Sequence, residues 1–333
     1  MSIKVEARYP HRDEMGEGPH WDAATNTLLR VDTLLGQVHR LEPMTGDQTT
    51  LQLDSPLGFA VPSGSGSVTV GIGHSVQRVD PDGTRSEVTS IEADNEDLRF
   101  NDGKCDRDGR LFFGSLSYSR EPAGGLYRLT GDGQLDQILL GITVSNGMCW
   151  DDERSLYYYV DSWEQRIDVF DCDPRTGDVS GRRPFAHIAP ETGLPDGMAI
   201  DTEGGVWIVM FFRGTVLRYE PDGRLSEVVP LPVTCPTSVA FGGPGLRTLF
   251  ITSSRHRLDE RERTEQPLAG AVFSCDPGVA GRAVPGFEQP AVPVRPTPGR
   301  PASAEPEPQA QERSYSSSLT SSSKVVLPSD TAV

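Results

Sequence analysis

Two sets of four polar residues are separated by one fixed spacing in this chain. The sets are Glu17, Asn101, Asn146 and Asp196 and, five positions later in each case, Asp22, Asp106, Asp151 and Asp201. Carboxylate and amide oxygens are the ligands that Ca²⁺, Mg²⁺ and Mn²⁺ prefer, and Zn²⁺ also accepts carboxylates. If the fold brings the first set together, these side chains could bind one divalent ion. Taken singly, each residue could instead cap the turn before a strand, as Asp and Asn commonly do.

The elements that must position these residues are short, apolar, strand-like runs. Typical runs are Thr27–Asp32, Gln37–Leu41, Ser67–Gly71, Leu111–Gly114, Leu156–Val160, Arg166–Phe170, Val206–Val209 and Thr248–Thr252. Asp-Gly turn dipeptides lie between such runs, and no long segment has the 3.6-residue apolar period of a helix. The pattern predicts an all-β protein. The charged run Arg257–Glu265 is predicted to be a solvated loop.

One unit of strands and turns recurs along the chain at intervals of roughly 40 to 50 residues, which is the spacing of propeller blades. Its copies begin near Gly18, Gly58, Gly103, Gly147, Gly197 and Ser238. Six copies predict a six-bladed β-propeller over residues 1–287. A pair of β-sandwiches is the alternative, but a sandwich does not require a repeat of this length. The segment Ile3–Tyr9 could pair with the last copy and close the ring.

The repeat gives the polar residues a common phase. Equivalent positions in different blades lie at equivalent points around the propeller axis, so Glu17, Asn101, Asn146 and Asp196 should converge at one mouth of the central channel. In the other two copies the corresponding positions, near Leu57 and Thr237, are apolar or weakly polar. The common phase favours a cation site over four separate turn caps.

The overall composition excludes several classes of protein. A net charge of −17 disfavours binding to nucleic acid. The five cysteines are odd in number and lack C-x-x-C spacing, which favours a reducing compartment over a disulfide framework. No signal peptide is visible, and no run approaches the about 18 apolar residues of a membrane span. We therefore expect a cytoplasmic protein without a membrane partner.

The last part of the chain differs from the rest in composition. Residues 288–333 are rich in Pro, Ser, Glu and Gln and almost without large apolar side chains. Such a segment cannot bury enough surface to offset the entropy of ordering it. It is predicted to be a disordered tail, in which Val325–Leu327 could be a docking motif or simply part of a solvated segment.

Several motifs resemble those of the senescence-marker-protein, gluconolactonase and regucalcin-like family. They are GEGPHWD (Gly16–Asp22), RFNDGK (Arg99–Lys104), VSNGMCW (Val144–Trp150), LYYYVDS (Leu156–Ser162) and LPDGMAID (Leu194–Asp201). The similarity extends from about residue 10 to about residue 287, without the tail. It implies a six-bladed propeller that hydrolyses sugar lactones, such as gluconolactone-type substrates, to aldonic acids.

The resemblance also implies roles for particular residues. Glu17, Asn146 and Asp196 match the family's ligands for one divalent metal ion, which could be Ca, Zn, Mn or Mg. Asp196 also matches the proposed general base. Arg99 and Asn101 match the residues that contact the substrate.

One loop departs from the family pattern. Where some members carry a glutamate that touches the sugar, this chain has SLSYSREP, with Ser119 at the nearest position and Tyr118 beside it. Both are candidate substrate contacts. Tyr118 could offer a ring face and a hydroxyl to a sugar, or it could be an ordinary surface residue. Asp102 could orient Lys104, Arg99 or a bound water, or it could be a turn residue before Gly103.

Two other functions fit the same residues. A propeller metal site could hydrolyse aryl esters or phosphotriesters, although the pair Arg99 and Asn101 favours a polyhydroxylated substrate. The protein could also be a calcium-binding regulatory protein without catalytic activity. On the first hypothesis the partner is a small-molecule sugar lactone, and the protein is expected to be a monomer or weak oligomer.

Overall fold

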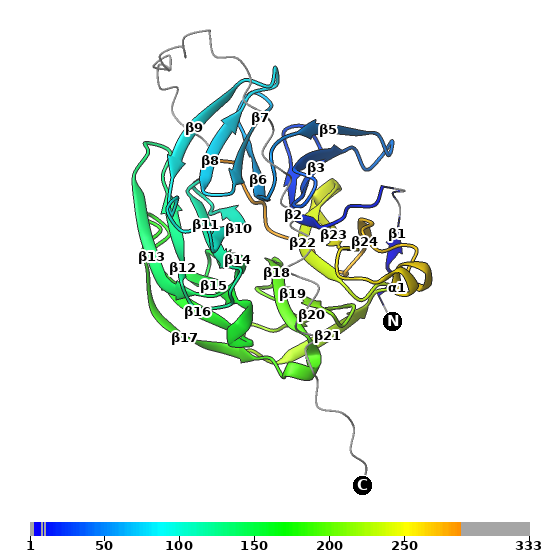
Figure 1. Ribbon diagram of the computed structural model, residues 1–333. Helices are drawn as coiled ribbons and strands as arrows, with labels where there is room; N and C mark the ends of the chain where they lie inside the picture. Colours follow the sequence, from blue (N-terminus) through cyan, green and yellow to red (C-terminus); the bar gives the residue numbers. More distant parts are fainter. Residues whose placement is uncertain (1–2, 8, 10, 288–333) are drawn as a thin grey trace. The chain divides into compact units, whose positions relative to one another are not determined.

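The computed structural model describes residues 3–7, 9 and 11–287 (Figure 1). In this part of the chain the strands form six four-stranded antiparallel sheets, arranged as blades around a central axis. The predicted all-β, six-bladed propeller is confirmed. The predicted disordered tail, residues 288–333, lies outside the described residues.

Each blade is built from strands that follow one another in the sequence. Blade 1 contains β2 (Gly16–Asp22), β3 (Thr27–Asp32), β4 (Gln37–Leu41) and β5 (Gln48–Gln52); blade 2 contains β6 (Leu57–Ser63), β7 (Ser67–Ile72), β8 (Ser75–Val79) and β9 (Arg85–Ser90); blade 3 contains β10 (Leu98–Cys105), β11 (Leu111–Ser117), β12 (Gly124–Leu129) and β13 (Leu135–Ile142). Blade 4 contains β14 (Ser145–Asp151), β15 (Leu156–Asp161), β16 (Arg166–Cys172) and β17 (Val179–His187); blade 5 contains β18 (Leu194–Ile200), β19 (Val206–Phe211), β20 (Thr215–Tyr219) and β21 (Leu225–Pro230); blade 6 contains β22 (Pro236–Gly242), β23 (Thr248–Ser253), β24 (Phe273–Cys275) and β1 (Glu6–Ala7). Three short 3-10 helices lie between strands: η1 (Ser162–Glu164), η2 (Pro190–Thr192) and η3 (Pro244–Leu246).

The N-terminal strand closes the ring. β1 pairs with β24, with Glu6 opposite Ser274 and Ala7 opposite Phe273. Blade 6 therefore contains strands from both ends of the described chain. The predicted pairing of the segment Ile3–Tyr9 with the last blade is confirmed, but only Glu6 and Ala7 are paired. This pairing covers an edge that β24 would otherwise expose.

The inner strands of each blade are buried and the outermost strands are exposed. β14 and β19 are buried along their whole length, whereas β9 and β21 are mostly exposed or half-buried. Apolar side chains of neighbouring blades pack between the sheets. The rings of Trp207 in blade 5 and Phe241 in blade 6, for example, meet edge to face at 6.2 Å. The core thus lies between blades and holds each inner strand in place.

The predicted loop at Arg257–Glu265 is wrong in part, because it contains helix α1 (Glu260–Glu265). Asp259 accepts the backbone N–H of Glu262 at 2.8 Å, and the Glu262 carboxylate accepts that of Asp259 at 2.9 Å. This reciprocal capping stabilises the helix start. All six residues of α1 are polar or charged and none is buried, so the sequence shows no apolar period from which this helix could be predicted. Across the described residues, no helix has the length and apolarity needed to span a bilayer.

A C-terminal segment crosses the end of the channel at which the inner strands finish. Gly281 forms an isolated bridge with Asp201 of blade 5, and the Phe287 N–H donates to the Pro62 carbonyl of blade 2 at 2.8 Å. Figure 1 shows this segment in orange between β22 and β8. The opposite end of the channel, where the inner strands begin, is the end predicted to hold the cation.

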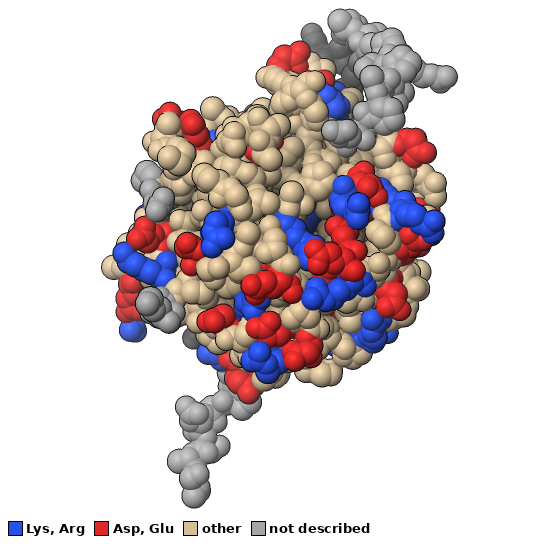
Figure 2. Space-filling model, turned by 180° about the vertical axis from the view of Figure 1, so that it is seen from behind, with Lys and Arg blue, Asp and Glu red and all other residues tan. Residues whose placement is uncertain are grey.

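The charged side chains are mixed on the surface. Figure 2 shows acidic and basic side chains interspersed on the face opposite to that of Figure 1, with uncharged areas between them. Exposed ion pairs also occur in the protein, such as Arg183 with Asp171 at 2.9 Å. The net charge of −17 is thus not gathered into one acidic patch on this face.

Candidate metal and substrate site

The innermost strand of every blade has a β-bulge near the predicted site, where it contains one residue more than the strand that pairs with it. In blade 1 the pairing passes from Glu17 opposite Val31 to His20 opposite Leu29, which leaves one residue of β2 without a counterpart. The equivalent interruptions in the other blades lie between Leu57 and Phe59, Phe100 and Asp102, Ser145 and Met148, Pro195 and Met198, and Pro236 and Val239. Such β-bulges re-aim side chains. The bulge therefore recurs where the chemistry-bearing residues lie.

Glycines next to the site allow the inner strands to approach closely. A Cβ added to Gly147 would lie 2.5 Å from the Asp196 carbonyl oxygen and 2.9 Å from the backbone nitrogen of Met198. A Cβ on Gly197 would overlap Ser238 of the next blade. Only glycine fits at such contacts. In Asn146-Gly147 and Asp196-Gly197, the first residue thus supplies a polar side chain and the glycine allows the neighbouring blade to come close.

A hydrogen-bond network orients the amide of Asn146. Its Oδ1 accepts from Asn101 Nδ2 at 3.1 Å, and the same Asn101 nitrogen donates to the Ser145 carbonyl at 2.8 Å. Asn146 Nδ2 donates to Ser162 Oγ at 2.9 Å, and Ser162 Oγ donates to the Pro195 carbonyl at 2.7 Å. Because the amide nitrogen is engaged with Ser162, Asn146 presents an oxygen with a second lone pair. Two predicted site residues from blades 3 and 4 are therefore in direct contact.

Three carboxylates complete the group: the buried Asp102 and Asp196 and the half-buried Glu17. Burial raises the pKa of Glu17 to about 8, and the charge of Asp102 adds to the effect. Burial also raises the pKa of Asp196 well above its usual range, with further contributions from Glu17 and Asp102. Asp196 Oδ1 is buried and has no hydrogen-bond partner among the described residues. Crowded carboxylates with an unpaired oxygen fit a divalent cation, whose charge would offset their repulsion. Asn146 is linked to the strand of Asp196 through Ser162, which donates to a backbone carbonyl of that strand.

Asp102 and Ser162 are members of this group that the sequence spacing did not predict. Asp102 lies within β10 rather than in a turn, and its Oδ1 accepts the N–H of Gly103 at 2.8 Å. Burial raises its pKa, while the charge of Lys104 acts in the opposite direction. The sequence does contain a signal. Asp102 occupies the position that holds glycine or serine in the other copies, namely Gly18, Gly58, Gly147, Gly197 and Ser238.

Arg99 and Tyr118 lie together at the side of the carboxylates. The Arg99 guanidinium carbon is 5.9 Å from the centre of the Tyr118 ring, and Arg99 Nη1 donates to the Phe100 carbonyl at 2.8 Å. Burial lowers the pKa of Arg99, whereas Tyr118 and Glu17 act to raise it. Arg99 is buried, but 44% of Tyr118 is exposed. A cation and a partly open aromatic ring therefore flank the candidate metal site.

Ser119 is engaged elsewhere. Its hydroxyl donates to Asp97 Oδ2 at 2.7 Å, and its backbone N–H donates to Asp97 Oδ1 at 2.8 Å. Ser117 Oγ also donates to Asp97 Oδ2, at 2.7 Å. In this conformation Ser119 fixes its own loop to Asp97, at the start of blade 3. Asp97 lies two residues before Arg99 in the sequence.

The second set of aspartates lies at the other end of the inner strands and pairs with arginines. The contacts are Asp22 with Arg40 at 2.7 Å, Asp106 with Arg110 at 2.5 Å, Asp151 with Arg154 at 2.6 Å and Asp201 with Arg218 at 2.7 Å. Several of these carboxylates also accept backbone N–H groups of the following turn, as Asp106 does from Asp108 and Arg110. These four aspartates therefore recur at the same position of their blades because they stabilise the following turn and pair with an arginine.

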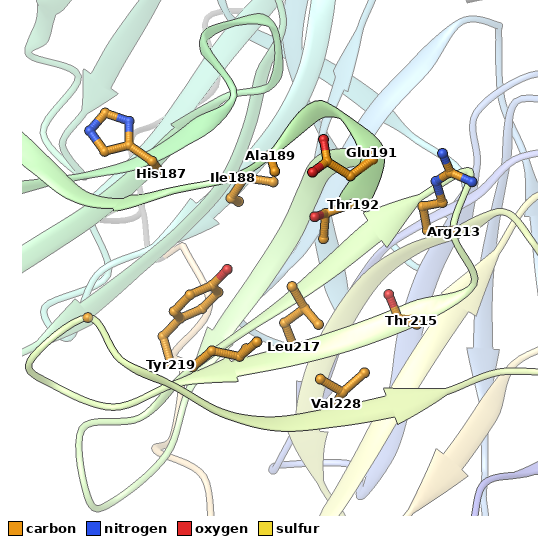
Figure 3. Close-up of a pocket in the computed structure, with 12 residues that line it drawn as sticks. His187, Ile188, Ala189, Glu191, Thr192, Arg213, Thr215, Leu217, Tyr219 and Val228 are labelled. Atoms are coloured by element: carbon orange, nitrogen blue, oxygen red, sulfur yellow. The ribbon is translucent and has the colours of Figure 1, made fainter. Parts of the chain in front are cut away.

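Two hollows lie apart from the carboxylate group. One, of about 620 Å³, is a surface groove along the outer strands of blades 4 and 5 (Figure 3). Its lining includes Ile188, Glu191, Arg213, Leu217 and Tyr219. The other, of about 330 Å³, lies under the C-terminal segment at the far end of the channel. Neither contains a residue of the predicted metal site.

Comparison with known proteins identifies the family. A family model described as the SMP-30/Gluconolactonase/LRE-like region matches residues 15–255. The chain is 33% identical over 294 residues to regucalcin of Oryctolagus cuniculus, which covers 86% of this chain and 98% of that protein. The chain therefore belongs to the SMP-30/gluconolactonase/LRE-like family, and the resemblance found in its motifs is confirmed.

Solved structures agree with this assignment. A luciferin-regenerating enzyme superposes with a TM-score of 0.80 at 30% identity, covering 86% of this chain and 99% of that one. A calcium-binding protein, regucalcin, from Agrobacterium tumefaciens superposes with a TM-score of 0.82 at 26% identity, covering 86% and 98%. The likeness spans the propeller in each case.

Proposed function

We propose that this protein hydrolyses sugar lactones to aldonic acids, using one divalent metal ion held by Glu17, Asn146 and Asp196. The observation that carries the proposal is the carboxylate group, with its unpaired Asp196 oxygen, beside the cationic side chain of Arg99. The family description includes gluconolactonase. The regucalcin structure is described as calcium-binding, which favours Ca²⁺, although the same oxygen ligands also suit Mg²⁺, Mn²⁺ or Zn²⁺.

The reaction needs a polarised carbonyl group and a water molecule directed at its carbon. An ion held by Glu17, Asn146 and Asp196 would supply a Lewis acid for the lactone carbonyl group. Asp196 would act as the general base, with one carboxylate oxygen on the ion and the other accepting a proton from the attacking water. Asp196 thus has two functions, as ligand and as base.

Arg99, Asn101 and Tyr118 bind and orient the sugar. Arg99 uses one nitrogen on the Phe100 carbonyl and retains other N–H groups for substrate hydroxyls. The Asn101 nitrogen is engaged with Asn146 and Ser145, so its oxygen is the atom that can accept from a hydroxyl. The exposed ring of Tyr118 offers an apolar face. Ser119 contributes by fixing this loop through Asp97.

The first prediction compares two identical tripeptides. Asp196 lies in Pro195-Asp196-Gly197 at the site, and Asp222 lies in Pro221-Asp222-Gly223 at an exposed turn. We expect Asp196→Asn to lower lactone turnover by about 10²–10⁴-fold, the usual contribution of a general base. Asp222→Asn should retain it. The measurement is proton release from a panel of aldonolactones, with phenyl acetate as an ester, after loading with Ca²⁺, Zn²⁺, Mn²⁺ or Mg²⁺.

Two outcomes would reject this function. Turnover of phenyl acetate without turnover of any lactone would support the aryl-ester alternative. Stoichiometric Ca²⁺ binding by the wild type, without turnover under any of the four ions, would support a calcium-binding regulatory protein. The latter is the second candidate, because the regucalcin from Agrobacterium tumefaciens is described as calcium-binding.

A further inference from the structure

A second group of metal-binding residue types lies away from the propeller axis, at the closure of the ring. His11 and Asp13 belong to the segment that leads from β1 in blade 6 to β2 in blade 1, and His39 lies on β4. Nε2 of His11 is 3.0 Å from Asp13 Oδ1, and Nε2 of His39 is 3.3 Å from the same oxygen. One ligand atom from each of the three residues lies within 4.8 Å of the others.

The Nε2 atoms of His11 and His39 face Asp13 Oδ1 without forming a hydrogen bond of good geometry. Nε2 of His11 and Nε2 of His39 are both buried, and neither makes a contact of hydrogen-bond geometry within the described residues. His39 as a whole is fully buried. A buried polar atom without a partner is costly. Two imidazole nitrogens thus lie within 3.3 Å of one carboxylate oxygen, and this donor set is typical of zinc sites.

The other nitrogen of His39 is held by a neighbouring strand. Its Nδ1 lies 2.9 Å from Thr50 Oγ1, on β5, and 3.3 Å from Gln48 Nε2. A hydrogen bond on one imidazole nitrogen fixes the ring and the tautomer, as is usual for histidines that bind metals. If Nδ1 donates to Thr50, Nε2 presents its lone pair toward Asp13. If Nδ1 accepts from Gln48, Nε2 carries the proton, and the group is a proton-sharing network.

Arg30 holds the second carboxylate oxygen of Asp13. Its Nε donates to Asp13 Oδ2 at 2.7 Å, and its Nη2 donates to Gln48 Oε1 at 2.9 Å, with a longer contact of 3.3 Å to Oδ1. The main ion pair therefore uses the oxygen that does not face the imidazoles. The nearby carboxylate of Asp32 repels that of Asp13, which contributes to the raised pKa of Asp32 after burial.

We propose that His11, Asp13 and His39 bind a divalent transition-metal ion of the zinc class, separate from the ion on the axis. The ion fastens the segment between β1 and β2 to blade 1 and thereby secures the ring closure. The side chain of His11 is 37% exposed, which gives an ion access from solvent and leaves room for a water ligand. The proposed role is structural, and none of the three residues lines either of the two hollows described above.

The second prediction tests this site by adding Zn²⁺ to the full chain after its axial site has been loaded with Ca²⁺. Zn²⁺ should shift the side-chain nuclear magnetic resonance signals of both His11 and His39 at one equivalent. Ca²⁺ should leave them unchanged, because it prefers oxygen ligands. Loss of an outer-shell partner alone weakens a metal site by about 10–100-fold, so His11→Ala should weaken Zn²⁺ binding by at least that factor. The His39 shift should then disappear at one equivalent.

Matched variants separate this site from other effects. His187→Ala removes an exposed histidine of β17 and should retain the His39 shift. Asp196→Asn should also retain it, so failure of the axial site leaves this test intact. The proposal is wrong if Zn²⁺ leaves the wild-type His39 signal in place, or if His11→Ala binds as tightly as the wild type. The group would then be a proton-sharing network.

Discussion

Three carboxylates influence one another at the start of the inner strands, namely the half-buried Glu17 and the buried Asp102 and Asp196. Arg99 and Lys104 are neighbouring cations. Lys104 Nζ donates to the Met198 carbonyl at 2.6 Å. This hydrogen bond fixes the ammonium group at a position from which its charge acts on Asp102. Like charges in a water-poor site repel strongly, since the local dielectric screens them weakly. A divalent cation converts this repulsion into attraction. Asp102 should therefore strengthen cation binding even without being a ligand.

Asp102→Asn provides the third prediction. The amide has nearly the same shape and can still accept the N–H of Gly103, so the backbone should be preserved. Loss of one negative charge near the cation should weaken Ca²⁺ binding by about tenfold or more, given the strength of charge interactions at short range in proteins. Calorimetric titration of the metal-free protein with Ca²⁺ measures this change.

Asp108→Asn is the control for the same change in charge. Asp108 lies in the turn after β10, at the other end of blade 3, and its side chain is 47% exposed. Its replacement should leave Ca²⁺ affinity within about twofold of the wild type, because exposed and distant charges are screened. Equal affinities for both variants and the wild type would show that the charge of Asp102 does not act on the cation.

The sequence predicted part of this group for a geometric reason. Residues at one phase of a repeat lie around one axis, and the contact between Asn101 and Asn146 has that origin. Asp102 has no acidic counterpart in the other copies, so the repeat did not reveal it. Ser162 follows a second strand, outside the phase that was compared. Whether Ser119 touches a substrate depends on the conformation of its loop, which the residue types do not determine.

At the scale of the strand, the site depends on a bulge and a close approach between blades. Asn146 is followed by Gly147, whose Cα lies against the backbone of Asp196 and Met198 in blade 5. Since backbone atoms cannot move aside as a flexible side chain can, an added methyl group must push β14 and β18 apart. The distance between Asn146 and Asp196 would change with it. Stability and metal affinity should therefore fall together.

The fourth prediction is that Gly147→Ala lowers the free energy of unfolding by about 1–3 kcal/mol, the usual cost of overpacking. It should also weaken Ca²⁺ binding. Gly64→Ala is the control, because a Cβ at Gly64 would meet no atom within 4 Å. That variant should match the wild type in urea denaturation and in calorimetric titration. If Gly147→Ala lost stability but kept full affinity, the close approach would serve packing alone.

The strands themselves were predictable to different degrees. β3 and β4 begin and end where their apolar runs do, because both are largely buried. The outermost strands β5, β9 and β21 were not recognised, because they are mostly exposed and carry many polar residues. Their pairing is determined by the exposed edge of the preceding strand rather than by their own apolar pattern. Helix α1 was missed for a similar reason.

At the scale of the whole molecule, two segments link distant blades. β1 joins the start of the propeller to blade 6, and the segment ending at Phe287 joins blade 5 to blade 2 across the end of the channel. Phe287 is fully buried and packs in a cluster with Phe59 and Phe100. The sequence placed the boundary of the propeller at residue 287 from composition alone. The burial of Phe287 makes this residue part of the propeller core, while the boundary itself stays a prediction.

The fifth prediction follows from this anchor. Phe287→Ala in the full chain should lower the free energy of unfolding by about 3–5 kcal/mol, the usual cost of removing a buried phenylalanine side chain. A chain that ends at Phe287 should unfold at the same urea concentration as the full chain, because the polar composition of residues 288–333 predicts no contribution to the core. A chain that ends at Gly286 should unfold at lower urea. If removal of residues 288–333 alone destabilised the protein, the proposed domain boundary at 287 would be wrong, and the tail would have to pack on the propeller.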